Sequence, residues 1–186
     1  HQIVANMGTV IYMVPLSLSI ATMTLVSQSI GADRPERAEE IGWSSVFFTT
    51  STCILIGVAV WFFRMQLLDL YDPPEAVKVF SIPLFLFIAF YQVFDALQVT
   101  AAFILRAYRI AFWPMVIYAG SLWGVGLGGG YLMGFNVLGF TPEFLQGANG
   151  FWAGNSISLG LAACLLLYLF RKTAERYEKT HPPVEV

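Results

Sequence analysis

Five long stretches of the chain are almost free of charge. Four of them contain no Asp, Glu, Lys or Arg: residues 1–32, 41–63, 110–142 and 144–170. The fifth, residues 79–105, contains Asp95 alone. Each stretch can supply the roughly 20 apolar residues that a helix needs to cross about 30 Å of hydrocarbon. A soluble bundle would instead need a polar outer face on every helix, and these stretches have almost none.

We therefore predict an all-α membrane protein, a bundle of five transmembrane helices whose partner is the lipid bilayer. The composition agrees, because 57% of the 186 residues are hydrophobic and only 12% are charged. An average soluble domain is about a quarter charged. The expected spans are residues 3–30, 41–63, 80–105, 113–135 and 151–170, followed by a tail at residues 171–186.

The positive charges indicate which way the chain crosses the membrane. Eight of the ten Lys and Arg residues fall on the side where the first, third and fifth spans end. By the positive-inside tendency this side is the cytoplasm, so we predict a multi-pass protein of the cell (inner) membrane with a cytoplasmic C-terminus. The chain begins at His1 without an initiator Met or a positively charged n-region, so we also expect it to be a fragment.

The sequence lacks the residues that several other functional classes require. The net charge is -2 and no basic stripe alternates with aromatic residues, so we expect no nucleic-acid partner. Cys53 and Cys164 each lie within a span, and His1 and His181 stand at opposite ends, so no cluster has metal-ligand spacing and no cofactor is implied. An enzyme would need a base, nucleophile or metal constellation, and the sequence has none, so we expect no enzyme.

Small residues recur at every fourth position in the last two spans. The fourth span has two interleaved rows of glycine, and the fifth span has one row of small residues: Gly120, Gly124 and Gly128; Gly126, Gly130 and Gly134; Gly150, Gly154, Ser158 and Ala162. Spacing by four lets a neighbouring helix approach the backbone closely. Close helix packing is the interpretation that we favour, and local bending is the alternative.

One carboxylate, Asp95, interrupts the third span within "FYQVFDALQV". It precedes Arg106 by eleven residues, or about 16 Å along a helix, and this depth is close to the bilayer centre. A charged carboxylate at that depth costs about 2.5 to 3.5 kcal/mol on insertion scales when it faces lipid. We therefore expect Asp95 to face protein or water.

Two interpretations of Asp95 remain open. It could be a permanently paired or protonated group that hydrogen-bonds a neighbouring helix. Alternatively, it faces a cavity and exchanges a proton or a monovalent cation, which is the interpretation that we favour for an intramembrane acid. Tyr91, Gln92 and Gln98 lie within about 60° of Asp95 around the helix, so Tyr91 is a second candidate ligand and the two glutamines are candidate lining residues. Polar Asn6 of the first span is a third lining candidate.

Four segments are similar, in the same order, to helices of a known family, the multidrug and toxic compound extrusion (MATE) transporters, particularly their bacterial branch. "HQIVANMGTVIYMVPLSLSIATMTLVSQSIGADRPERA" is similar to the eighth of that family's twelve membrane helices. "YQVFDALQVTAAFILRAYR", "WGVGLGGGYLMGF" and "GFWAGNSISLGLAACLLL" are similar to the tenth, eleventh and twelfth. The Tyr-Gln-x-x-Asp-x-x-Gln pattern is the most specific part of the resemblance.

The resemblance implies a transporter of two six-helix lobes that works by alternating access. Inward sodium or protons would drive the export of bulky organic compounds, often cationic and aromatic. This chain would hold helices eight to twelve and would need the N-terminal lobe and helix seven as partners. The resemblance places Asp95 at the acid of the tenth helix that is implicated in cation coupling, and Tyr91 at the aromatic residue one turn before it.

A flippase for lipid-linked sugars, from the wider superfamily, is the alternative function. Such a protein would hold phosphate groups with several Lys or Arg residues inside its spans. The five spans of this chain contain none, so we prefer the antiporter.

Overall fold

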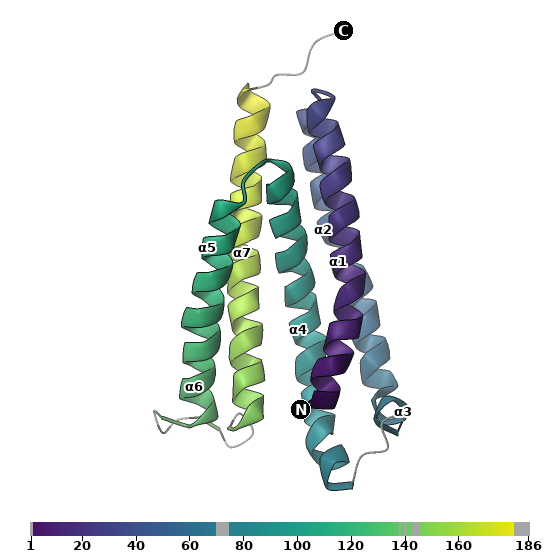
Figure 1. Ribbon diagram of the computed structural model, residues 1–186, viewed down its shortest axis with the longest axis vertical. Coiled ribbons are helices and arrows are strands. Elements are labelled where there is room, and N and C mark those ends of the chain that lie inside the picture. The colour runs from purple at the N-terminus through teal and green to yellow at the C-terminus, as the bar shows by residue number, and fades with distance from the viewer. Residues whose placement is uncertain (1, 70–74, 138, 140, 143–145, 181–186) are drawn as a thin grey trace.

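The computed structural model describes residues 2–69, 75–137, 139, 141–142 and 146–180 (Figure 1). The regular structure of these residues is helical throughout: α1 (Gln2–Gly31), α2 (Pro35–Phe62), α3 (Arg64–Asp69), α4 (Glu75–Ala107), α5 (Phe112–Gly120), the π-helical segment η1 (Ser121–Leu127), α6 (Gly128–Gly134) and α7 (Ala148–Thr180). The predicted all-α fold is confirmed. His1 and His181 lie outside the described residues, as does the end of the expected tail, residues 181–186.

Four helices in the described part of the chain are long and apolar enough to cross a membrane: Asn6–Gly31, Pro35–Phe62, Ile88–Ala107 and Ala148–Thr180. They correspond to the first, second, third and fifth predicted spans. The fourth predicted span, residues 113–135, falls on α5, η1 and α6, which follow one another without a break. The backbone at Gly120 and Gly128 is helical, so the hydrogen-bond register changes at these joints while the run continues in the same direction (Figure 1).

The helix ends differ from the predicted spans in two places. Helix α2 begins at Pro35, well before residue 41, because a proline fits the first turn of a helix, where no backbone N–H is needed. Helix α7 continues past residue 170 to Thr180, and Arg171 Nε lies 3.0 Å from Glu175 Oε1 one turn later. The first part of the expected tail is therefore helical.

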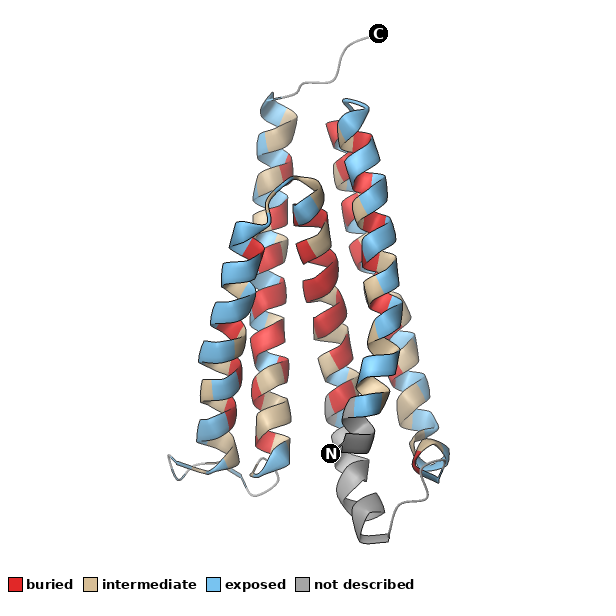
Figure 2. Cartoon of the chain, viewed as in Figure 1, coloured by how far each residue is buried: buried red, intermediate tan, exposed pale blue. Residues whose placement is uncertain are grey.

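Helix α4 is the centre of the bundle. It packs between α7 on one side and α1 and α2 on the other (Figure 1). In its most apolar stretch 61% of the residues are buried, against 22% in α1 and 28% in α2. Figure 2 shows that the outer faces of α1 and α2 are largely exposed. The exposed residues there include large apolar ones such as Phe47, which is 76% exposed. Such faces suit contact with lipid.

Close packing of glycines joins α5, η1 and α6, called here the three-part run, to α7. A Cβ atom placed on Gly154 of α7 would lie 2.6 Å from the backbone nitrogen of Gly130 and 3.0 Å from the carbonyl oxygen of Gly126. Gly134 faces α7 as well, against Phe151. The packing prediction is thus confirmed for the second row of glycines. A Cβ atom on any member of the first row, Gly120, Gly124 or Gly128, would meet no atom of the described residues within 4 Å.

Candidate functional site

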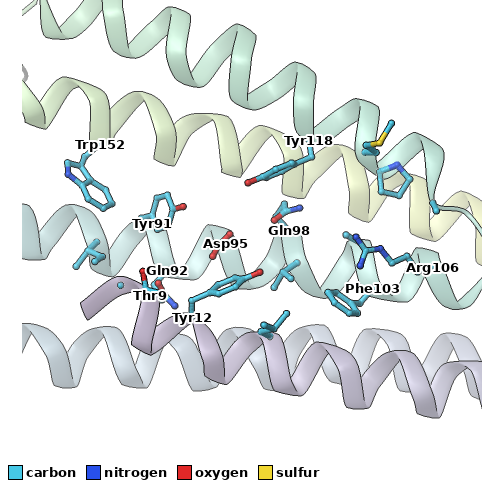
Figure 3. Close-up of a pocket in the computed structure, with 18 residues that line it drawn as sticks. Thr9, Tyr12, Tyr91, Gln92, Asp95, Gln98, Phe103, Arg106, Tyr118 and Trp152 are labelled. Atoms are coloured by element: carbon cyan, nitrogen blue, oxygen red, sulfur yellow. The ribbon is translucent and has the colours of Figure 1, made fainter. Parts of the chain in front are cut away.

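A cavity of about 770 Å³ lies beside the middle of α4 (Figure 3). Four polar side chains of α4 line it because they recur on one side of the helix: Tyr91, Gln92, Asp95 and Gln98. Helix α1 forms the opposite wall with Gly8, Thr9, Tyr12 and Leu16, and further lining residues come from α5 and α7, among them Pro114, Met115, Tyr118 and Trp152. The structure therefore brings together residues from four helices around the predicted acid.

Asp95 is buried, with 7% of its surface exposed, and it lines this cavity. Within the described residues no hydrogen bond or ion pair reaches its carboxylate. Tyr12, Tyr91 and Tyr118 line the same cavity. Among the described residues, Asp95 thus faces a cavity edged by aromatic residues, and the choice between the two interpretations stays a prediction.

The basic residue that lines the cavity, Arg106, stands at its far end. It follows Asp95 by about 16 Å along α4. Its guanidinium carbon lies 4.8 Å from the centre of the Phe103 ring, a cation–π contact. The other lining residues include no Lys or Arg, so the described part of the chain places no fixed cation on Asp95.

Tyr91 lies one turn before Asp95, as predicted. Its ring packs edge-on against Trp152 of α7, with 5.4 Å between ring centres and 82° between planes. This contact fixes the ring at the wall of the cavity. No hydrogen bond joins the Tyr91 hydroxyl to Asp95 in the described structure, so its role as an ion ligand stays a prediction.

The three candidate lining residues differ in position. Gln92 and Gln98 both line the cavity and are 2% and 8% exposed. Neither the oxygen nor the nitrogen of the Gln92 carboxamide has a hydrogen-bond partner among the described residues. Asn6 is exposed and is not among the residues that line this cavity, where α1 contributes Thr9 and Tyr12 instead.

Sequence reasoning missed the aromatic residues that other helices bring to Asp95. Tyr12 lies in α1, Tyr118 in α5 and Trp152 in α7, and each stands in an apolar run that gives an aromatic residue no special signal. Only the packing of α1, α5 and α7 around α4 shows that they meet. Among the described residues no three His, Cys, Asp or Glu side chains cluster as a multivalent metal site would require.

Residues 1–132 match the model of the MatE family. This match covers well over half of the chain. The chain belongs to the MatE family. The resemblance to MATE transporters, stated above on the Tyr-Gln-x-x-Asp-x-x-Gln pattern and the glycine-rich run, is thereby confirmed.

Curated relatives of this MatE chain are longer than the chain itself. It is 37% identical over 95% of its length to the "Probable multidrug resistance protein NorM" of Aromatoleum aromaticum, of which it spans 38%. It is 31% identical over 97% of its length to the "Multidrug resistance protein PmpM" of Pseudomonas aeruginosa, of which it spans 37%. The chain thus spans a little over a third of these relatives.

A solved structure supports the fold independently. The crystal structure of the eukaryotic MATE transporter AtDTX14 superposes on this MatE chain with a TM-score of 0.80 and 18% sequence identity. The superposition covers 96% of this chain and 40% of the transporter. The helical arrangement around α4 is therefore that of part of a MATE transporter.

Proposed function

We propose that this chain is part of a cation-coupled antiporter of the cell (inner) membrane that exports bulky organic compounds, cationic or aromatic. The observation that carries the proposal is Asp95, a buried carboxylate on a cavity, with no ion pair among the described residues. The names of the NorM and PmpM relatives, which are multidrug resistance proteins, support export as the direction of transport. The proposal is for transport without chemical conversion of the compound.

The coupling would arise from competition for one negative charge. Asp95 is the acid among the described residues that line the cavity, and either a sodium ion, a proton or an organic cation would neutralise it. Once one of these ligands has bound, the electrostatic attraction for the next is removed. Antiport by alternating access then requires that the two ligands favour different states of the transporter.

The size and lining of the cavity suit the proposed compounds. Its volume of about 770 Å³ lies within the range of sites that enclose drug-sized molecules. Tyr12, Tyr91, Tyr118 and Trp152 supply aromatic faces, which attract both flat apolar rings and cations. The flippase alternative gains no support here, because a single basic residue, Arg106, lines the cavity in the described structure.

The rest of the transporter would complete this site. Since the chain spans 38% of the NorM relative, we propose that an N-terminal lobe and the helix before α1 close the cavity and provide its second access. We further propose that Thr180 and the residues after it lie in the cytoplasm, which the excess of positive charge at that end of α7 favours.

The test is Asp95→Asn in the complete transporter, reconstituted in proteoliposomes with ethidium as the transported cation. The substitution removes the exchangeable charge and keeps the shape, so ion-gradient-driven ethidium transport should fall at least about tenfold while the protein still inserts. The matched control is Asp33→Asn, in the connection between α1 and α2, where the residue has φ 54° and asparagine tolerates that conformation. Undiminished transport by the Asp95 variant would reject the proposal.

A further inference from the structure

Gln92 carries a carboxamide that the proposed coupling does not use. The side chain is 2% exposed, and both of its polar atoms are buried without a hydrogen-bond partner in the described part of the chain. Such a group costs free energy, because it has lost its bonds to water and gained none in return. Gln92 also lines the cavity, so its carboxamide can gain the missing bond from a ligand there when the side chain turns towards that ligand.

The position of Gln92 relative to Asp95 limits what that ligand is. Gln92 stands three positions before Asp95, which corresponds to about 4.5 Å along the helix and about 60° around it. A carboxylate and an amide carbonyl oxygen are both hydrogen-bond acceptors. Helix α4 therefore carries two acceptors that line the cavity from positions three residues apart, and one of them bears a charge.

Aromatic rings stand on either side of the same carboxylate. In Figure 3 Tyr118 of α5 lies above Asp95 and Tyr12 of α1 lies below it, and both line the cavity. A flat cation held by Asp95 would meet the faces or edges of these rings. These rings attract planar and tetrahedral cations alike, so a preference between the two depends on the N–H donors of the ligand.

We propose that Asp95 and Gln92 together form a two-acceptor site for planar cations that carry at least two N–H donors, such as amidinium or guanidinium compounds. One N–H donates to the Asp95 carboxylate and a second donates to Gln92 Oε1. A quaternary ammonium compound has no N–H and gains only the attraction of Asp95. Gln92 is thus a specificity-determining residue, and this inference rests on the proposed function.

The experiment measures binding of two aryl cations to the complete transporter in detergent by isothermal titration calorimetry, in sodium-free buffer at one pH. The probes are benzamidinium, which has N–H donors, and phenyltrimethylammonium, which has none. Gln92→Met keeps the length of the side chain and removes the acceptor. Loss of a hydrogen bond to a charged donor should weaken benzamidinium binding about 10- to 100-fold, while phenyltrimethylammonium binding changes less than about twofold.

Gln98→Met provides the comparison, because Gln98 is the other glutamine that α4 contributes to the cavity, three residues on the opposite side of Asp95. It should change the binding of both probes by the same factor. Equal weakening of both probes by Gln92→Met, no effect on either, or the same discrimination from Gln98→Met would overturn the inference. Retained binding of phenyltrimethylammonium shows that the variant is folded.

The two proposals fail in different ways. If Asp95→Asn abolishes ethidium transport but Gln92→Met weakens both probes equally, the antiporter stands and the two-acceptor site is wrong. If Asp95→Asn leaves ethidium transport intact, the antiporter proposal fails first. In that case a selective loss of benzamidinium binding in Gln92→Met would still locate the amidinium at Gln92.

Discussion

Gly154→Ala tests the packing that holds the three-part helical run against α7. The added Cβ atom would lie 2.6 Å from the nitrogen of Gly130, 2.8 Å from its Cα and 3.0 Å from the oxygen of Gly126. All three are backbone atoms, so no side chain can turn away to make room. Either η1 and α6 move away from α7 together, or the substitution strains the contact.

The expected cost follows from two opposing terms. Overpacking a tight contact costs about 1 to 3 kcal/mol, and backbone neighbours place this case near the upper end. Alanine favours the helix over glycine by about 1 kcal/mol, which offsets part of that cost. The free energy of unfolding should therefore fall by about 2 kcal/mol. For a transporter of the length of the NorM relative, of which this chain spans 38%, this corresponds to about 2 °C in melting temperature.

The assay is thermal unfolding of the complete transporter in detergent, followed by intrinsic tryptophan fluorescence. The matched control is Gly160→Ala, six residues further along α7, where the nearest atom to the new Cβ would be Phe94 Cδ1 at 3.4 Å. This is an ordinary contact with a side chain, and the same gain in helix propensity applies. Equal melting temperatures for the two variants would refute the close-contact argument.

Two further predictions concern the end of the bundle at which α2 begins. Gly42→Ala should also lower the melting temperature, because its Cβ would lie 2.6 Å from Cζ of the fully buried Phe170, and an unchanged value would mean that the ring moves freely. Burial, the Glu39 carboxylate and Tyr177 raise the pKa of Tyr108 from 10.0 to about 12. The wild-type protein should therefore lose stability relative to Tyr108→Phe as pH rises from 10 towards 12, and chemical unfolding at pH 9 and 11 measures the difference.

The helical framework and the centre of the site could be predicted from the sequence because both depend on local rules. Long uncharged stretches predicted helices that cross a membrane, and the structure has them at α1, α2, α4 and α7. The helical repeat predicted that Tyr91, Gln92 and Gln98 share a side with Asp95, and all four line one cavity. This prediction needs only the helical repeat within α4, because all four residues lie on that helix.

The remainder of the site depends on contacts between helices. Tyr12 precedes Asp95 by more than eighty residues and Tyr118 follows it in another helix, so no local pattern connects them. The unsatisfied carboxamide of Gln92 is likewise a property of its neighbours, since the sequence shows a glutamine but not whether α1 or α7 offers it a partner. For the same reason, Asn6 could not be distinguished from Thr9 as a lining residue on polarity alone.

The two rows of glycine also combine a feature that the sequence predicts with one that depends on contacts between helices. Their spacing by four is identical, so the sequence predicts that both can pack closely and cannot choose between them. The choice is made by α7, whose Gly154 leaves room only for the backbone of Gly126 and Gly130. The π-helical turn of η1 lies between the two regular pieces, and it changes the register within the run from which both rows project. The first row meets no described atom within 4 Å and so leaves space for a neighbour outside the described residues.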